Sequence, residues 1–224
     1  MDDMFVTGSG LFITEATTQQ CRLACKQWHY SKTCVAVVRA GYAIYENGRW
    51  IGCVVFANGI QNAQATEWGL DWERCIELVR VALDKHETQV TRIIALCIGF
   101  LKKKFPELEL IISYSDLSRG HKGGIYKGGN WVFIGETAPC HMVVLNDKRI
   151  SPRSLSHYKI SQTDVKKTEK YVKNKFVYPL SDNMRAKLRE RSSSNPAKEG
   201  VSIRPARSNL PIEAAKAQQS LDLS

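Results

Sequence analysis

The chain has 224 residues, 43% of them hydrophobic, and a formal net charge of +10. This length and composition are typical of one globular domain with appendages. No apolar run approaches the roughly 20 residues that a membrane span needs, and no signal peptide is recognisable, so we expect a cytoplasmic protein without a membrane anchor. The seven cysteines are an odd number without framework spacing, which favours free thiols in a reducing compartment.

The positive charge is concentrated in the C-terminal third. Residues 1–147 contain 15 lysines and arginines against 15 aspartates and glutamates, whereas residues 148–224 contain 17 against 7. Basic and aromatic residues are interleaved there, as in proteins that bind nucleic acid. We therefore expect a folded domain at 1–147, a basic nucleic-acid-binding extension packed on it at 148–191, and a disordered tail at 192–224. The candidate phosphate contacts in the extension are Arg149, Lys166 and Lys167.

Apolar periodicity predicts a helix that begins after Thr17 or Thr18 and ends near His29. Asn47-Gly48 indicates a hairpin, because this pair readily adopts the positive φ angles of a type I′ turn. The strands expected around it are Cys34–Val38, Tyr42–Tyr45 and Trp50–Phe56. Residues 58–69 are predicted to form a loop, and residues 1–16 give no strong signal.

The middle of the chain predicts a β-α-β unit. Cys75–Leu83 is an apolar run typical of a central strand, Thr88–Lys104 has helical periodicity, and residues 108–115 alternate as a strand. Arg80 interrupts the first strand, and a buried charge needs a partner. Two interpretations of Arg80 stay open: a structural ion pair, or a cation directed into a site against a carboxylate or phosphate. Further strands are expected at 131–135 and 141–145, and a short basic helix at 183–191.

The stretch from Leu108 to Gly135 has the composition of a binding site. Its first strand ends in Ser115 and Asp116, a loop with five glycines surrounds His121, and the second strand begins at Trp131. Polar groups at the end of a buried strand, beside backbone without Cβ atoms, suit close approach of a ligand. The plainer interpretation is a glycine-rich connection between two strands, in which Asp116 is a turn or cap residue.

The order of these elements indicates an α/β three-layer fold with a mixed central sheet. It resembles the second half of the GNAT N-acyltransferase fold, with 124–131 similar to that family's short tyrosine-containing helix. In that family the crossover helix begins at the pyrophosphate of acyl-CoA. The resemblance therefore implies an acetyl-CoA site formed by Val90, Thr91, Arg92 and Tyr126. The sequence departs from the family at 87–95, where glycines are usual and β-branched residues stand instead.

A more extensive resemblance is to the phage Mom DNA-modification family. It rests on four motifs between residues 28 and 135, with a weaker one at 178–188. The four motifs are Trp28–Lys32, Glu46–Gly52, Glu77–Leu83 and Ser115–Trp131. The resemblance implies a GNAT-like enzyme that adds an acetamido-type (carbamoylmethyl) group to adenine N6 in double-stranded phage DNA and so protects that DNA from host restriction. It also implies a phage- or prophage-encoded protein of the bacterial cytoplasm, linked to acetyl-CoA and iron.

Adenine N6 is a weak nucleophile, so such an enzyme must flip the base, stack it and remove a proton. On this resemblance Asp116 is the base or a metal ligand. The other catalytic candidates are His29, Tyr30, Arg80 and Ser115. The candidate contacts to the base or to DNA are Ser31, Lys32, His121 and Trp131. A 2-His-1-carboxylate site for Fe²⁺ would consist of His29, Asp116 and His121, although nothing in the sequence places His29 near the other two.

Two other classes of function stay open at this point. A GNAT-type N-acyltransferase for an amine of a protein or small molecule would bind acyl-CoA and would need no DNA. A non-catalytic basic DNA-binding protein on the same scaffold would bind DNA in a salt-dependent way and would have no activity to lose. The sequence does not indicate the oligomeric state.

Overall fold

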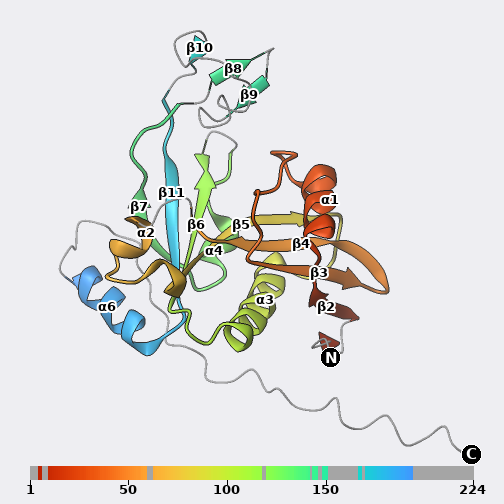
Figure 1. The fold of residues 1–224 in the computed structure, drawn as a ribbon, viewed down its shortest axis with the longest axis horizontal. Helices are drawn as coiled ribbons and strands as arrows, with labels where there is room; N and C mark the ends of the chain where they lie inside the picture. Colours follow the sequence, from red (N-terminus) through yellow and green to blue (C-terminus); the bar gives the residue numbers. More distant parts are fainter. Residues whose placement is uncertain are drawn as a thin grey trace, which may run out of the picture.

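A computed structural model describes residues 5–6, 10–59, 63–117, 120–141, 143–145, 148–150, 166–167 and 170–193. Its centre is an eight-stranded sheet with the order β1-β2-β3-β4-β5-β6-β11-β7 (Figure 1). The strands, in that order, are Phe5–Val6, Leu11–Glu15, Ala40–Glu46, Arg49–Ala57, Cys75–Leu83, Leu110–Asp116, Lys173–Pro179 and Val132–Glu136. Only β5 and β6 pair in parallel, and all other neighbours are antiparallel, so the sheet is mixed as predicted.

Helices cover both faces of this sheet and give three layers. The crossover helix α3 (Val90–Lys104) buries Ile93, Ile94, Cys97 and Leu101 against one face. On the other face, α1 (Thr18–Trp28) packs over β3, β4 and β5 through small side chains. Helix α6 (Asp182–Ser193) covers the second half of that face, where Met184 and Leu188 join the core formed by β6, β7 and β11. The α/β three-layer prediction is therefore confirmed.

Local sequence explains where α1 begins and ends. The Thr17 side chain accepts the N–H of Gln20 at 3.2 Å, and the Gln20 side chain accepts the N–H of Thr17 at 2.9 Å, which is a capping box. At the other end His29 leaves helical geometry with ψ 139°. His29 and Tyr30 therefore lie beyond the C-terminal end of α1 and are not part of its surface.

Two predicted elements before β5 differ in the structure, and one strand there was not predicted. Cys34–Val38 is not a strand, because no neighbouring strand pairs with it, and β-propensity alone does not form a ladder. Residues 11–15, which gave no signal, form β2 and pair with β3. The expected loop at 58–69 contains the short helix α2 (Ala63–Thr66), and a 3-10 turn, η1 (Trp72–Arg74), leads into β5.

The basic C-terminal segment contributes a strand to the main sheet. β11 lies between β6 and β7, with Lys173 opposite Asp116 and Pro179 opposite Leu110. A second, three-stranded sheet of order β10-β8-β9 is formed between β7 and β11 in the chain. Its strands are β8 (Val143–Leu145), β9 (Lys148–Ile150) and β10 (Lys166–Lys167). The expected tail lies almost wholly outside the described residues, since only its first two residues belong to α6.

Much of the charge on α6 is used within the molecule. Arg191 pairs with Glu67 at 3.1 Å and lies over the Trp68 ring, and Lys187 donates to the Trp68 carbonyl. These contacts join α6 to the segment that follows α2, so Lys187 and Arg191 have partners in another part of the protein. None of the helices in the described parts of the chain is both long and apolar enough to cross a membrane.

Candidate functional site

The site is formed where the two parallel strands of the sheet separate. β5 and β6 pair only at Cys75–Glu77 and Leu110–Ile112, so the remaining residues of both strands diverge. A cleft of about 570 Å³ opens between them, lined by the second half of β5, the end of β6, the turn after α1 and the glycine loop before α4 (Gly124–Lys127). Val79 has no partner on β4, because Val55 pairs with Arg80 and Phe56 with Leu78. This bulge lies in the cleft wall, a common position for bulges beside active sites.

His29 is held in the cleft wall as a neutral imidazole. Its side chain is buried, and its Nδ1 atom accepts the N–H of Ser31 at 3.1 Å and lies 2.7 Å from the Ser31 hydroxyl oxygen. Since an amide N–H can only donate, Nδ1 is the acceptor and the neutral ring carries its proton on Nε2. Burial, with the positive charge of Arg80 and the nearby His121 and Lys32, lowers the pKa of His29 to about 4. At neutral pH the ring is therefore uncharged and can donate one hydrogen bond.

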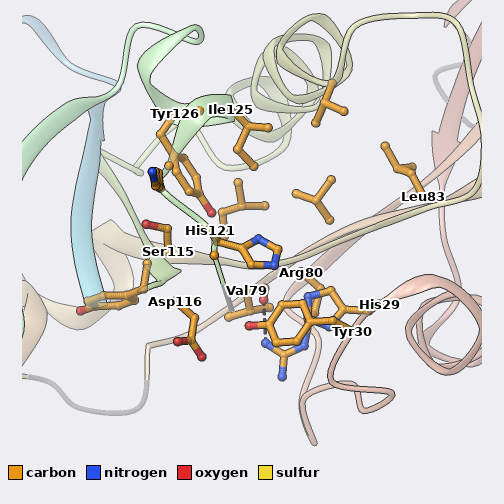
Figure 2. A pocket seen from close by; sticks show the side chains of 18 of the residues that line it. His29, Tyr30, Val79, Arg80, Leu83, Ser115, Asp116, His121, Ile125 and Tyr126 are labelled. Atoms are coloured by element: carbon orange, nitrogen blue, oxygen red, sulfur yellow. Dashed lines mark hydrogen bonds between the residues drawn. The ribbon is translucent and has the colours of Figure 1, made fainter. Parts of the chain in front are cut away.

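Tyr30 connects two histidines at the mouth of the cleft. The centroid of its ring is 4.3 Å from that of His29 and 5.1 Å from that of His121, with interplanar angles of 34° and 41°. Nearly half of the Tyr30 side chain is exposed, at 49%. Figure 2 shows these rings with Arg80 and Asp116 around the same space. An exposed aromatic face beside a cavity can stack on a planar ligand.

Arg80 lies in the same wall, and its hydrogen bonds bear on the two interpretations of its charge. Its Nε atom donates to the Thr33 carbonyl at 3.0 Å, and Nη1 donates to the Val79 carbonyl at 2.7 Å. Both acceptors are neutral, and an arginine has five N–H donors. The contacts therefore fix the guanidinium at the cleft while leaving donors for an anionic or carbonyl ligand, which favours the interpretation that Arg80 points into a site.

The end of β6 contributes Ser115 and Asp116. The buried Ser115 hydroxyl lines the cleft and has no hydrogen-bond partner among the described groups. A buried hydroxyl without a partner costs free energy, so such a group in a cleft is well placed for a ligand. Asp116 also lines the cleft and is half-buried (Figure 2).

Tyr126 forms the opposite wall with apolar neighbours. Ser113 Oγ donates to the Leu78 carbonyl at 2.8 Å, so the Tyr126 hydroxyl at 2.8 Å donates to Ser113 Oγ. This chain of hydrogen bonds joins β5 to β6 at the point where they begin to diverge. Trp131 lies behind Tyr126, with ring centroids 5.1 Å apart, and is buried in the core rather than in the cleft wall.

The structure brings most of the predicted site residues together, but not all of them. Eight line the one cleft: His29, Tyr30, Arg80, Val90, Ser115, Asp116, His121 and Tyr126. Ser31 supports His29, and Lys32 donates to the Gln27 carbonyl at 2.9 Å at the end of α1. Thr91 and Arg92 lie on α3 outside the lining residues, and Arg149, Lys166 and Lys167 are on the small sheet.

Among the lining residues that were not predicted, four have aromatic or polar side chains: Trp28, His86, Tyr114 and Lys122. Tyr114 alternates with Ser113 and Ser115 on β6, and the divergence of β5 from β6 exposes it to the cleft. Lys122 is next to His121 in the glycine loop, so its charge could have indicated from sequence that it lines the cleft. His86 follows a strand end, where side chains of adjacent parallel strands collect, and it could have been found on the same ground.

The residues proposed for iron do not fit a metal site. No group of three His, Cys, Asp or Glu side chains within the described ranges is arranged to hold a metal ion. A metal-bound histidine normally donates its second ring N–H to an oxygen acceptor, whereas His29 Nδ1 faces the N–H of Ser31. The Tyr30 ring also contacts both histidines of the proposed set. No step of the chemistry below is therefore assigned to iron.

The protein fits the thioester arm of acetyl-CoA better than it fits the diphosphate. Leu83, Val90 and Ile125 give the cleft an apolar wall that suits an extended, uncharged arm. The turn before α3 offers less to the diphosphate, because the N–H groups of Glu87 and Thr88 are bonded to the Glu46 carboxylate at 2.8 Å. The residues present thus fit the thioester arm and do not fit a diphosphate at this turn.

The strand order with β11 between β6 and β7, the single parallel pair and the cleft at its divergence define a GNAT acyltransferase fold. A model described as the Mom protein family matches residues 10–197. The chain therefore belongs to the Mom family. No curated protein sequence matches it.

Solved acetyltransferases resemble the chain at low identity. The IAA acetyltransferase from Bacillus cereus ATCC 14579 is 12% identical over 76% of this chain and 99% of its own, with a TM-score of 0.43. A putative phosphinothricin N-acetyltransferase is 11% identical over 77% and 99%, with a TM-score of 0.47. A GNAT family acetyltransferase from Elizabethkingia anophelis with acetyl-CoA bound is 12% identical over 76% and 99%, with a TM-score of 0.42. Identities this low say nothing about a shared substrate.

Proposed function

We propose that this protein is a DNA-modifying transferase that adds a carbamoylmethyl group to N6 of adenine in double-stranded phage DNA and thereby protects that DNA from restriction enzymes of the host. The observation that carries the proposal is membership of the Mom family over residues 10–197. The composition of the cleft supports it, because its exposed aromatic ring can stack on a flipped base and its carboxylate can accept a proton from an amine.

The roles of the residues follow from where they lie. The exposed Tyr30 ring stacks on the flipped adenine, and the remaining N–H donors of Arg80 bind a carbonyl or negative charge of the bound ligands. When N6 exchanges a hydrogen for the carbamoylmethyl group, it loses a proton. Asp116 accepts that proton, since it is the carboxylate of the cleft. His29 donates a hydrogen bond from Nε2 and keeps the ligand oriented.

The donor lies along the apolar wall towards α3. By family resemblance acetyl-CoA would be held here and would supply the two carbon atoms, while the N–CH₂ bond and the amide nitrogen of a carbamoylmethyl group would need a two-electron oxidant and a nitrogen donor besides. Val90 and Tyr126 line this part of the cleft, and Ser115 presents its unbonded hydroxyl at the junction of the two ends. The polar end then receives the base, while the apolar end receives the donor.

The small sheet supports a place for duplex DNA. It follows β7 and precedes β11, and β11 begins opposite Asp116, so the segment that carries it leaves the main sheet at the end where β6 opens into the cleft (Figure 1). Within it, Lys166 pairs with Val144, which pairs with Arg149, so the two basic residues occupy one row across the strands. Basic residues in this position neutralise phosphates beside the flipped base.

The proposal is tested by nucleoside mass spectrometry of DNA from cells that produce the protein. We expect a deoxyadenosine in which one hydrogen is replaced by a carbamoylmethyl group, and we expect that DNA to resist restriction enzymes with adenine in their target. Acylated protein or small-molecule amines with unmodified DNA would instead identify an ordinary N-acyltransferase. Unmodified DNA and no acylated product, from soluble and folded protein, would identify a non-catalytic DNA-binding protein.

A further inference from the structure

The turn between β5 and α3 contains a carboxylate from a distant part of the sequence. Glu46, the last residue of β3, is buried, and its two carboxylate oxygens accept the backbone N–H groups of Glu87 and Thr88, each at 2.8 Å. These amides lie directly before α3, whose N-cap residue, Gln89, makes no side-chain cap hydrogen bond. The first turn of α3 contains no acidic residue. Glu46 is thus the carboxylate that is bonded to the amides before α3.

This position is one that normally attracts an anionic ligand. The helix after a parallel strand begins at the carboxyl end of the sheet, where free N–H groups and the helix dipole together bind phosphate. Burial acts to raise the pKa of Glu46, but hydrogen bonds from Thr88 and Glu87 outweigh burial and hold the pKa below its usual value. Glu46 is therefore ionised at neutral pH, and a second anion at the same two amides would meet both its charge and its bulk.

The neighbouring groups leave little room for a phosphate to bind elsewhere in this turn. Val90 and Thr91 follow the N-cap, and both are β-branched, so their side chains hinder close approach to the next two amides. The cleft wall beside them is apolar, formed by Leu83, Val90 and Ile125. In Figure 2, Leu83 and Ile125 lie apart from the group formed by Arg80, Tyr30 and Asp116. The cleft thus has a charged end and an uncharged end, and α3 lies at the uncharged one.

We propose that Glu46 determines the specificity for the donor by filling the anion position before α3, so that the donor binds through an uncharged arm and gains no anchor from a diphosphate there. The proposal deepens the proposed function, on which it rests for the view that the cleft receives an acyl donor. The shared chemistry of the donors it admits is an acyl group on a pantetheine-like arm. Whether the rest of the donor is the nucleotide of CoA or another carrier then makes little difference to binding in the cleft.

Titration calorimetry with CoA, pantetheine and inorganic pyrophosphate tests this without DNA. In wild type we expect CoA to bind no more than about threefold tighter than pantetheine. In Glu46→Gln, where at least one amide loses its anionic partner, we expect the preference for CoA to rise to about tenfold or more, and pyrophosphate to bind about tenfold tighter than to wild type. Glu87→Gln is the matched control, because it removes one negative charge from the same turn while the amides stay bonded to Glu46.

Two results would overturn the proposal. The first is a wild-type protein that already binds CoA at least about tenfold tighter than pantetheine. The second is a Glu46→Gln protein that matches Glu87→Gln in its affinity for pyrophosphate, since the effect would then be one of net charge alone. If neither variant binds pyrophosphate detectably, the two variants also match, and the proposal is overturned in the same way.

A measurement on the wild type keeps the proposal testable if Glu46→Gln does not fold. The amide NMR signals of Glu87 and Thr88 should not move when CoA or pyrophosphate is added, because Glu46 holds both amides. Saturable shifts of these two signals would show that a ligand phosphate takes the place of Glu46. Neither experiment contains DNA. Unmodified cellular DNA would therefore contradict the proposed function without affecting the role of Glu46, and a failed binding test would contradict the role of Glu46 without affecting DNA modification.

Discussion

At the scale of single residues, His29 links the chemistry of the cleft to pH. Its pKa is lowered to about 4 by burial and by Arg80, His121 and Lys32, whereas an unfolded histidine titrates near 6.5. Between these values the unfolded chain binds more protons than the folded protein, so stability falls as the pH is lowered from 6.5 to 4 and is unaffected by this group above 6.5.

We predict that His29→Gln loses less stability than wild type over that window. The difference should be on the order of 1 kcal/mol, or a few degrees in melting temperature, after allowance for solvent screening. Thermal melts at pH 7 and pH 4.5 measure it. Parallel loss of stability in the two proteins would show that His29 is not held neutral by its surroundings.

Two serines on β6 allow function to be separated from stability. Ser113 donates to the Leu78 carbonyl and accepts from Tyr126, whereas the Ser115 hydroxyl has no partner in the described part of the chain. We predict that Ser113→Ala lowers the free energy of unfolding by about 1–3 kcal/mol, because it leaves buried polar groups unbonded. Ser115→Ala should leave the free energy unchanged or raise it slightly, and should nevertheless reduce DNA modification.

Denaturant unfolding and nucleoside analysis of the same two variants check this pair. A Ser115→Ala protein as active as wild type would remove Ser115 from the site. A Ser115→Ala protein as unstable as Ser113→Ala would mean that its hydroxyl is a structural group.

At the scale of elements, the glycine loop before α4 is fitted to the core beneath it. Gly123 has φ +79°, and a Cβ atom there would lie 2.4 Å from the Phe176 ring of β11. Gly120 has a similar φ of +74°, but a Cβ atom there would meet nothing within 4 Å. An alanine at either position would have the strain of a positive φ, and only the alanine at position 123 would also clash with a neighbour.

We predict that Gly120→Ala costs about 1 kcal/mol and Gly123→Ala about 2–4 kcal/mol, because the second change adds a clash with a buried ring to the strain of a positive φ. Chemical denaturation of both variants gives the comparison. Equal losses would indicate that the loop relaxes away from Phe176 and that the cleft wall is not fixed by this contact.

The same elements show what could be predicted from sequence. The capped helix α1, the hairpin around Asn47 and the crossover unit follow from local pattern, and Ser115 and Asp116 follow from alternation on β6. The prediction of a strand at Cys34–Val38 was wrong, because this segment has β-propensity but no neighbouring strand pairs with it. β11 was missed because half of its pattern is lysine and asparagine, and only its neighbours β6 and β7 make it an interior strand. Glu46 was missed because its partners lie 41 and 42 residues away.

At the scale of the whole molecule, the sheet places the chemistry and the basic segment at one end. β11 lies between β6 and β7 and is antiparallel to both, so Asp116, Glu136 and Lys173 all lie where the small sheet leaves the main one. Among the described basic residues of this C-terminal third, two groups therefore differ in position. Lys187 and Arg191 hold α6 against the fold, whereas Arg149, Lys166 and Lys167 belong to the sheet at the cleft end and are the residues proposed to bind DNA.

Nucleoside mass spectrometry of cellular DNA shows whether Asp116 takes the proton from adenine N6. DNA should be compared from cells that produce wild type, Asp116→Asn or Glu136→Gln at matched soluble levels. Glu136→Gln is the control, because it makes the same carboxylate-to-amide change at the same end of the sheet, on β7 and outside the cleft. We predict carbamoylmethyl-deoxyadenosine with wild type and Glu136→Gln, and a loss of at least about a hundredfold with Asp116→Asn. Modified DNA from Asp116→Asn at the wild-type level, or unmodified DNA from folded wild type, would contradict the account.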